Sequence, residues 1–191
     1  MNLSQQAGLA ALQAVTAKYN SGTLLGYQGL LPATPEASIG SATLLITFNF
    51  SANAFPSPLF DANGYYKANA SFTANPVLPS ANGTISFMRA LQSGGSTVIA
   101  DFTIAQSWAP SLAVLQNQYI LANGNSYICT TSGTTASTGS GPSSTGTNII
   151  DGTAHWMYLA LGSTDLAVSN AVLSTSVQFS LPFLWQVMPC V

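Results

Sequence analysis

Tyr127-Ile-Cys129 lies in the second half of the chain. It is followed by the tract Thr130 to Thr147 and, after Asn148, by the segment Ile149-Ile-Asp-Gly-Thr-Ala-His-Trp-Met-Tyr158. The tract contains only Thr, Ser, Gly, Ala and Pro. It can bury too little apolar surface to offset the entropy lost on ordering, so we expect either a mobile loop or a tie between two strands. Its flanks are aromatic or β-branched, which favours strands. The pattern predicts one small β module that interrupts a larger β unit.

The predicted module covers residues 106–159, with a flexible loop over residues 130–147. Asn123-Gly124 is a strong hairpin signal between the strands expected at Gln118–Leu121 and Ser126–Thr130. A unit of this size is marginal for independent folding. We therefore expect it to pack on the larger unit or on a neighbouring molecule.

The larger unit is predicted to comprise residues 1–105 and 160–191. Strict alternation predicts strands in three places: Ala42–Phe50, with Leu44, Ile46, Phe48 and Phe50 facing the core; a hairpin of Thr84–Leu91 with Ser96–Ile104, in which Ile85 and Phe87 share a side; and Leu173–Leu181, extended through Phe183, Trp185 and Val187. A helix is expected over residues 4–19, with Ser4 as N-cap and Leu12, Val15 and Tyr19 at helical spacing. The predicted fold is all-β: an antiparallel β-sandwich with one N-terminal helix and a small inserted β module.

Charge is scarce. Three basic and five acidic residues make up 4% of the chain, against about 25% in a typical soluble domain. So few cations cannot neutralise a run of phosphates, so no nucleic-acid partner is expected. Contacts of such a surface should be largely insensitive to salt. A charge-poor β surface also favours coverage by symmetry mates or by a larger assembly.

No targeting or membrane segment is predicted. The first nineteen residues lack a basic stretch and a continuous apolar run, so they do not resemble a secretory signal. No apolar run approaches the ~20 residues of a membrane span. Cys129 and Cys190 allow one disulfide at most, and without signs of an oxidising compartment two reduced cysteines are favoured.

No catalytic constellation is found. The single histidine, His155, follows Asp151 by four residues, but it has no identifiable nucleophile and no companion metal ligands. The carboxylates occur singly, without an acid/base pair of the glycosidase kind. Phosphate-binding and nucleophile-elbow motifs are absent from the sequence. We therefore expect no enzymatic activity, no catalytic residues, no metal and no cofactor.

The aromatic residues of the module are the remaining candidates for a site. They could form a platform for sugar rings, or they could be the core of a unit with few aliphatic residues, and the second interpretation is favoured. The candidates for a surface or glycan contact are Trp108, Tyr119, Tyr127, Trp156 and Tyr158.

Two sets of short motifs carry a family resemblance. In the module, the pattern Tyr127-x-Cys129, Gly141-Pro-Ser, Ile150-Asp-Gly-Thr153 and Trp156-x-Tyr158 resembles a small module that recurs in tailed-bacteriophage structural proteins. The surrounding unit resembles a family of small tailed-bacteriophage virion proteins. Its motifs are the alanine-rich first helix, Leu24 to Gly29, a Pro-rich turn, Leu44 to Phe55, an Asn-Gly-Thr strand near Arg89, and Ser93 to Asp101.

The resemblance implies a virion component, with no enzymatic activity. The favoured role is a capsid decoration or cement protein on the capsid surface, with the phage major capsid protein and further copies of itself as partners. One alternative is a tail or fibre component whose module contacts a host receptor, including a surface glycan. The other is a carbohydrate-binding module.

Overall fold

The computed structural model describes residues 4–60, 66–161, 165–168, 170–181 and 184–186. Strands account for 43% and helices for 9% of the protein, and the one α-helix lies near the N-terminus. The predicted all-β class with one N-terminal helix is confirmed. Phe183 and Val187 of the predicted last strand, and Cys190 of the possible disulfide, lie outside the described residues.

The helix α1 spans Gln5–Thr16 and continues as a 3-10 turn, η1, over Ala17–Tyr19. The Ser4 hydroxyl accepts a hydrogen bond from the Ala7 N–H at 3.2 Å, as expected for an N-cap. The buried side of α1 carries Gly8, Leu12 and Thr16. Val15, which was expected on the same face as Leu12, is 42% exposed because the buried stripe advances by four residues at each step.

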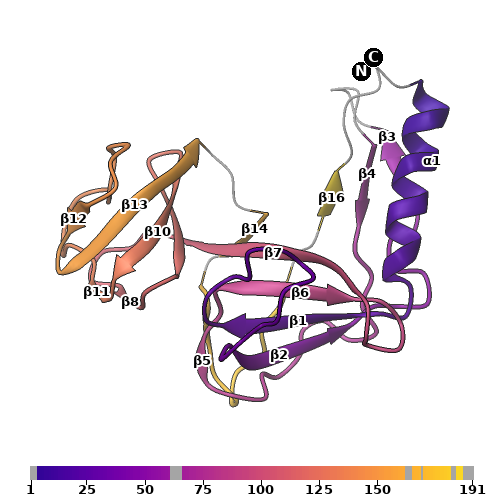
Figure 1. Cartoon of the computed structure of the whole chain (residues 1–191), viewed down its shortest axis with the longest axis horizontal. Helices are drawn as coiled ribbons and strands as arrows, with labels where there is room; N and C mark the ends of the chain where they lie inside the picture. The colour runs from indigo at the N-terminus through magenta and orange to yellow at the C-terminus, as the bar shows by residue number, and fades with distance from the viewer. Residues whose placement is uncertain (1–3, 61–65, 162–164, 169, 182–183, 187–191) are drawn as a thin grey trace.

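A nine-stranded sheet runs through the whole molecule in the order β12-β13-β10-β9-β7-β6-β1-β2, with β14 also paired to β7 (Figure 1). Its strands are β1 Thr23–Gln28, β2 Thr43–Asn49, β6 Phe87–Leu91, β7 Val98–Ser107, β9 Tyr119–Ala122, β10 Asn125–Thr131, β12 Ile149–Asp151, β13 Ala154–Leu161 and β14 Leu166–Val168. Small ladders flank it: β3 Leu59–Phe60, β4 Tyr66–Asn69 and β16 Leu184–Gln186; β5 Gly83–Thr84 and β15 Val172–Leu173; β8 Ala113–Val114 and β11 Gly133–Thr134.

Strand β7 connects the two halves of the sheet. Its first half pairs antiparallel with β6, and its second half pairs in parallel with β9 and β14. The N–H groups of Ile104 and Trp108 donate to Ser86 and Leu121, whereas the Thr103 N–H donates to Asp165 on the opposite edge. β6 and β9 therefore follow one another along one edge, with β14 on the other. The sheet is mixed at β7, where an antiparallel arrangement was expected.

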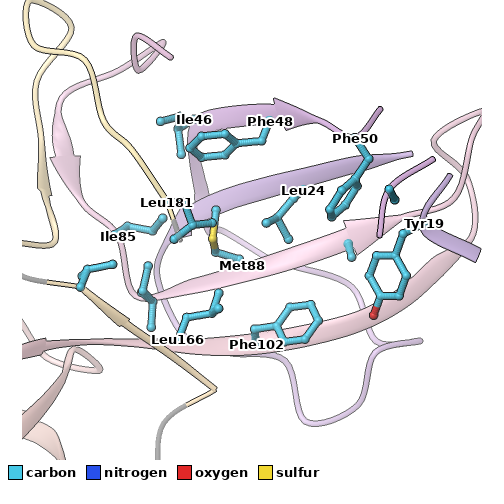
Figure 2. Packing of buried hydrophobic residues seen from close by; sticks show 14 of the residues in the cluster. Tyr19, Leu24, Ile46, Phe48, Phe50, Ile85, Met88, Phe102, Leu166 and Leu181 are labelled. Atoms are coloured by element: carbon cyan, nitrogen blue, oxygen red, sulfur yellow. The ribbon is translucent and has the colours of Figure 1, made fainter. Parts of the chain in front are cut away.

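The larger core lies on one face of β1, β2, β6 and β7, under β14, β15 and the segments that connect them (Figure 2). Its buried members include Leu24, Ile46, Phe48, Phe50, Ile85, Met88, Phe102, Ile104, Leu166, Leu173 and Leu181. This arrangement of the core is sandwich-like. The predicted hairpin across Gln92–Gly95 is also present, since β6 and β7 pair antiparallel.

Two predicted core assignments are wrong. The register of β1 and β2 skips Leu45, and at this irregularity Leu45 turns inward while Leu44 is 39% exposed. Phe87 does not share a side with Ile85, because β5 ends at Thr84 and β6 begins only at Phe87. Phe87 instead stacks on Tyr27, with ring centroids 5.2 Å apart, outside the core cluster that holds Ile85.

The predicted strand Leu173–Leu181 is also wrong over most of its length. After β15, the chain makes a tight turn that is closed by an isolated bridge between Ser174 and Val177. The turn interrupts the alternation, so Val177 is 62% exposed while Leu181 returns to the core. The alternation of apolar and polar residues predicted a strand, but the serine-rich residues after β15 form a turn instead.

A buried ion pair lies on the face of the sheet opposite the larger core. Arg89 donates from Nε and Nη2 to the two Asp101 carboxylate oxygens at 2.7 and 2.8 Å. Its Nη1 donates to the Ala37 carbonyl at 3.0 Å, which holds the loop between β1 and β2 over this face. Both side chains are less than a tenth exposed.

We expect Arg89→Met to lower the free energy of unfolding by about 3–5 kcal/mol in urea denaturation, because it leaves the buried Asp101 carboxylate unpaired. The double variant R89M/D101L should be distinctly more stable than R89M, since it leaves no unpaired charge. Equal losses in the two variants would show that the ion pair is not what the single change breaks.

Candidate functional site

The aromatic module, residues 106–159, has a hydrophobic core of its own. This cluster consists of Val114, Ile120, Ala122, Tyr127, Cys129, Ala154 and Trp156, and it is distinct from the larger core. The predicted hairpin is present, with Asn123 and Gly124 both at positive φ between β9 and β10. The division of the chain at residues 106 and 159 is compatible with two separate clusters, but the boundary at residue 106 falls inside β7, which ends at Ser107.

The five candidate aromatic residues do not form one exposed platform. Trp156 and Tyr127 are fully buried, and Tyr119 is 8% exposed. These three rings cannot meet a ligand on the surface of this structure. Trp108 and Tyr158 are half-buried at the edge of the module core, and the Tyr158 ring lies edge-on to Tyr127 with centroids 5.9 Å apart. A surface role is left to Trp108 and Tyr158 alone.

Trp108 is held by two contacts from the second half of the module. Its Nε1–H donates to Asp151 Oδ2 at 2.7 Å, and Asp151 Oδ1 accepts from the Ala136 N–H at 3.0 Å. The backbone of Gly141, at φ +84°, lies so close to the indole that a Cβ atom there would be 2.7 Å from Trp108 Cδ1 and Cγ. Trp108 is therefore an attachment point for the chain that crosses it.

The Ser/Thr tract, Thr130–Thr147, is fixed at several points. Thr135 is buried, donates to the Ala109 carbonyl at 2.7 Å and accepts from the Leu112 N–H at 2.8 Å. Asn123 Nδ2 donates to the carbonyls of Ser140 and Pro142, both at 3.0 Å. Of the two interpretations given to the tract, these contacts favour a tie between strands. Most of its residues are exposed, as expected.

His155 and Asp151 are not partners. His155 Nδ1 lies 2.8 Å from Asn148 Oδ1, while both oxygens of Asp151 are engaged by Trp108 and Ala136. Asp165 accepts from Thr103, and Asp101 is paired with Arg89. Among the described residues, no three His, Cys, Asp or Glu side chains are grouped closely enough to hold a metal ion.

Cys129 lies in the module core, 1% exposed. Its thiol donates to the Thr131 carbonyl at 3.2 Å, and burial raises the pKa of the thiol to about 11. Because the thiolate is the reactive form, this cysteine should be chemically inert in the folded protein.

A further surface feature lies at the other end of the molecule, beside α1 (Figure 1). The β3–β4 groove has a volume of about 670 Å³ and is lined by Pro56, Ser57, Leu59, Phe60, Lys67, Ala68, Asn69, Ala70 and Ser71. Leu59 and Phe60 are 70% and 41% exposed. The sequence predicts turns over residues 55–64 and a short strand around Tyr65 to Phe72, and β4 lies within that range. The overlooked signal was the apolar pair Leu59-Phe60 within the predicted turns.

Comparison with protein-family models, curated proteins and solved structures finds no match to this chain. Within the described part of the chain, no helix combines the length and apolar character that a membrane crossing requires.

Gly141→Ala should destabilise the protein by about 1–3 kcal/mol more than Gly139→Ala, and thermal unfolding should show the difference. Both glycines have positive φ, so both variants carry the backbone strain, but only at Gly141 would a Cβ atom meet Trp108. Equal destabilisation would mean that the Gly141–Trp108 contact does not hold the tract.

Cys129 should resist iodoacetamide in the native protein at mildly alkaline pH and react once denaturant is added, as followed by peptide mass spectrometry. The raised thiol pKa also makes the folded state lose stability as the pH rises through about 11, since thiolate formation is easier in the unfolded chain. Rapid native labelling of Cys129 would contradict its burial.

Proposed function

We propose that this protein is a non-enzymatic virion structural protein that decorates and stabilises the surface of a tailed-phage head. The observation that carries the proposal is the β3–β4 groove, which lies at the opposite end of the molecule from the aromatic module (Figure 1). The groove end would bind the major capsid protein, and the aromatic module would project outward. The sequence resemblance to small phage virion proteins supports the same role.

The chemistry of the groove suits a permanent protein contact. Leu59 and Phe60 offer apolar surface, and its burial is favourable by about 25 cal/mol per Å². Among the described residues that line the groove, Lys67 is the one that carries a charge. Exposed apolar side chains that line a groove are typical of interaction sites. Association through it should depend little on ionic strength, as the low charge of the whole chain also indicates.

The capsid surface presents many equivalent sites, so copies of this protein would lie side by side. Such neighbours would cover further exposed apolar side chains, including Leu30 at 62% and Leu78 at 56% exposed. We therefore include copies of the same chain among the proposed partners, in a symmetric homo-oligomer.

A tail or fibre component that contacts a host receptor is the second candidate. The observation that favours it is exposed apolar surface on the aromatic module itself, where Ile150 is 66% and Leu159 is 42% exposed. Half-buried Trp108 and Tyr158 also belong to the module. In that case the module, and not the β3–β4 groove, would make the essential contact.

Leu59→Asp should abolish saturable binding of the purified protein to undecorated phage capsids, while Ile150→Asp should bind like the wild type. The two residues have nearly equal exposure, 70% and 66%, so the pair separates the groove from the module without a difference in burial. Sedimentation with capsids measures binding, and wild-type binding should also raise the melting temperature of the capsid.

The decoration proposal fails if the wild-type protein does not bind capsids at all. The receptor-contact role would be favoured if the Ile150→Asp variant no longer adsorbed to host cells while neither change affected binding to capsids. A circular dichroism spectrum of each variant checks that a loss of binding does not come from unfolding.

A further inference from the structure

The path of the nine-stranded sheet ends at β2 on one side and at β12 on the other (Figure 1). The outer edge of β2 is covered, because the Leu45 carbonyl accepts from the Ser80 N–H at 2.7 Å and the Asn49 carbonyl accepts from the Thr73 N–H at 2.9 Å. Within the described parts of the chain, β12 pairs with β13 alone. The end of the sheet at β12 is therefore open.

The outward backbone groups of β12 belong to Ile150. The Tyr158 N–H donates to the Gly146 carbonyl on the β12 side, so every second residue of β13, counted back from Tyr158, faces β12. His155, which lies opposite Ile150, is not among them. The N–H and C=O of Ile150 consequently point away from the sheet, and the described parts of the chain supply no hydrogen bond to either group.

This edge has few of the features that normally prevent a strand from pairing with another molecule. Lysine, proline or an inward-pointing charge usually protects such an edge. Residues 146–153 contain no proline and no basic residue, and the Asp151 carboxylate is engaged by Trp108 and Ala136. The Ile150 side chain is 66% exposed. The edge is thus apolar and neutral, and its protection is its length of three residues.

We propose that two copies of this chain pair through β12, antiparallel about a twofold axis at Ile150. The N–H of each Ile150 then donates to the C=O of the other, and the two side chains cover one another with their Cα atoms about 5.5 Å apart. The edge is self-complementary in its hydrogen bonds and in its apolar surface, and neither copy brings an unpaired charge to it. This contact specifies the self-association that the proposed function includes.

The association closes at two copies. Pairing about a twofold axis uses β12 of both molecules, and the opposite end of the sheet is already covered at β2. Growth into a fibre through the ends of the sheet is therefore prevented. Because only three residues of each copy pair, we expect a weak dimer that is populated at protein concentrations on the order of 0.1–1 mM.

Sedimentation velocity of the full-length protein between about 10 µM and 1 mM tests the proposal. The wild type should pass from monomer to dimer without larger species. Ile150→Asp should weaken the dimer at least ~10-fold, because it places like charges opposite each other across the axis. Val177→Asp is the matched control outside β12, since Val177 is 62% exposed, and it should dimerise as the wild type does.

Hydrogen exchange distinguishes backbone pairing from a contact of side chains alone. The Ile150 amide, followed by NMR, should exchange more slowly as the protein concentration rises, because its N–H is bonded only in the dimer. Ile150→Pro removes this N–H at an edge position where proline is compatible with a strand. This variant should keep the circular dichroism spectrum of the wild type and lose the dimer.

A wild-type protein that stays monomeric at about 1 mM would overturn the proposal and leave the edge to a strand of another protein. A dimer that persists in Ile150→Asp, or an Ile150 amide whose exchange does not depend on concentration, would also overturn it. Capsid binding is measured at micromolar concentration, where this chain is a monomer. Loss of the dimer with capsid binding retained therefore leaves the decoration role standing, and the reverse result leaves the dimer standing.

Discussion

The structure depends on one shared strand. β7 contributes Phe102 and Ile104 to the larger core, and immediately after its end Trp108 packs against the core of the aromatic module. Backbone hydrogen bonds to β6 and then to β9 run along the same edge of this strand. At this crossing the aromatic module is therefore joined through the sheet itself.

With so few charges, the chain holds its loops by hydrogen bonds between neutral groups and the backbone. Ser86 connects the end of β1 to the segment before β6, Thr135 connects the Ser/Thr tract to residues 109–112, and Asn123 binds consecutive carbonyls of the same tract. The ionised groups that are buried in the described part of the chain have partners, as in Arg89 with Asp101 and in Asp151 with Trp108. Such contacts are short-range, so they specify local geometry and exert little long-range electrostatic attraction.

Local signals predicted local structure well. Ser4 marked the start of α1, and Asn123-Gly124 and Gln92–Gly95 marked two hairpins, because each depends on a few adjacent residues. Leu45 could not be placed, since its inward position depends on pairing with β1, and the segment after β15 turned although its residues alternate. The burial of Tyr127 and Trp156 followed from the size of the module, whereas a small cavity lined by both Gln28 and Gln118 joins residues that are ninety positions apart in sequence. No local pattern contains that kind of contact.

The attachments of the Ser/Thr tract divide it unevenly. Its contacts at Thr135, Ser140 and Pro142 are followed by an exposed span, Ser143–Thr145, before Gly146 accepts a hydrogen bond from Tyr158. Lengthening a surface loop is inexpensive, since each doubling of loop length adds only about 0.6 kcal/mol of closure entropy. A foreign peptide inserted in this span would leave both attachment points in place. The module therefore offers a position at which guest sequences could be displayed on the surface of this protein.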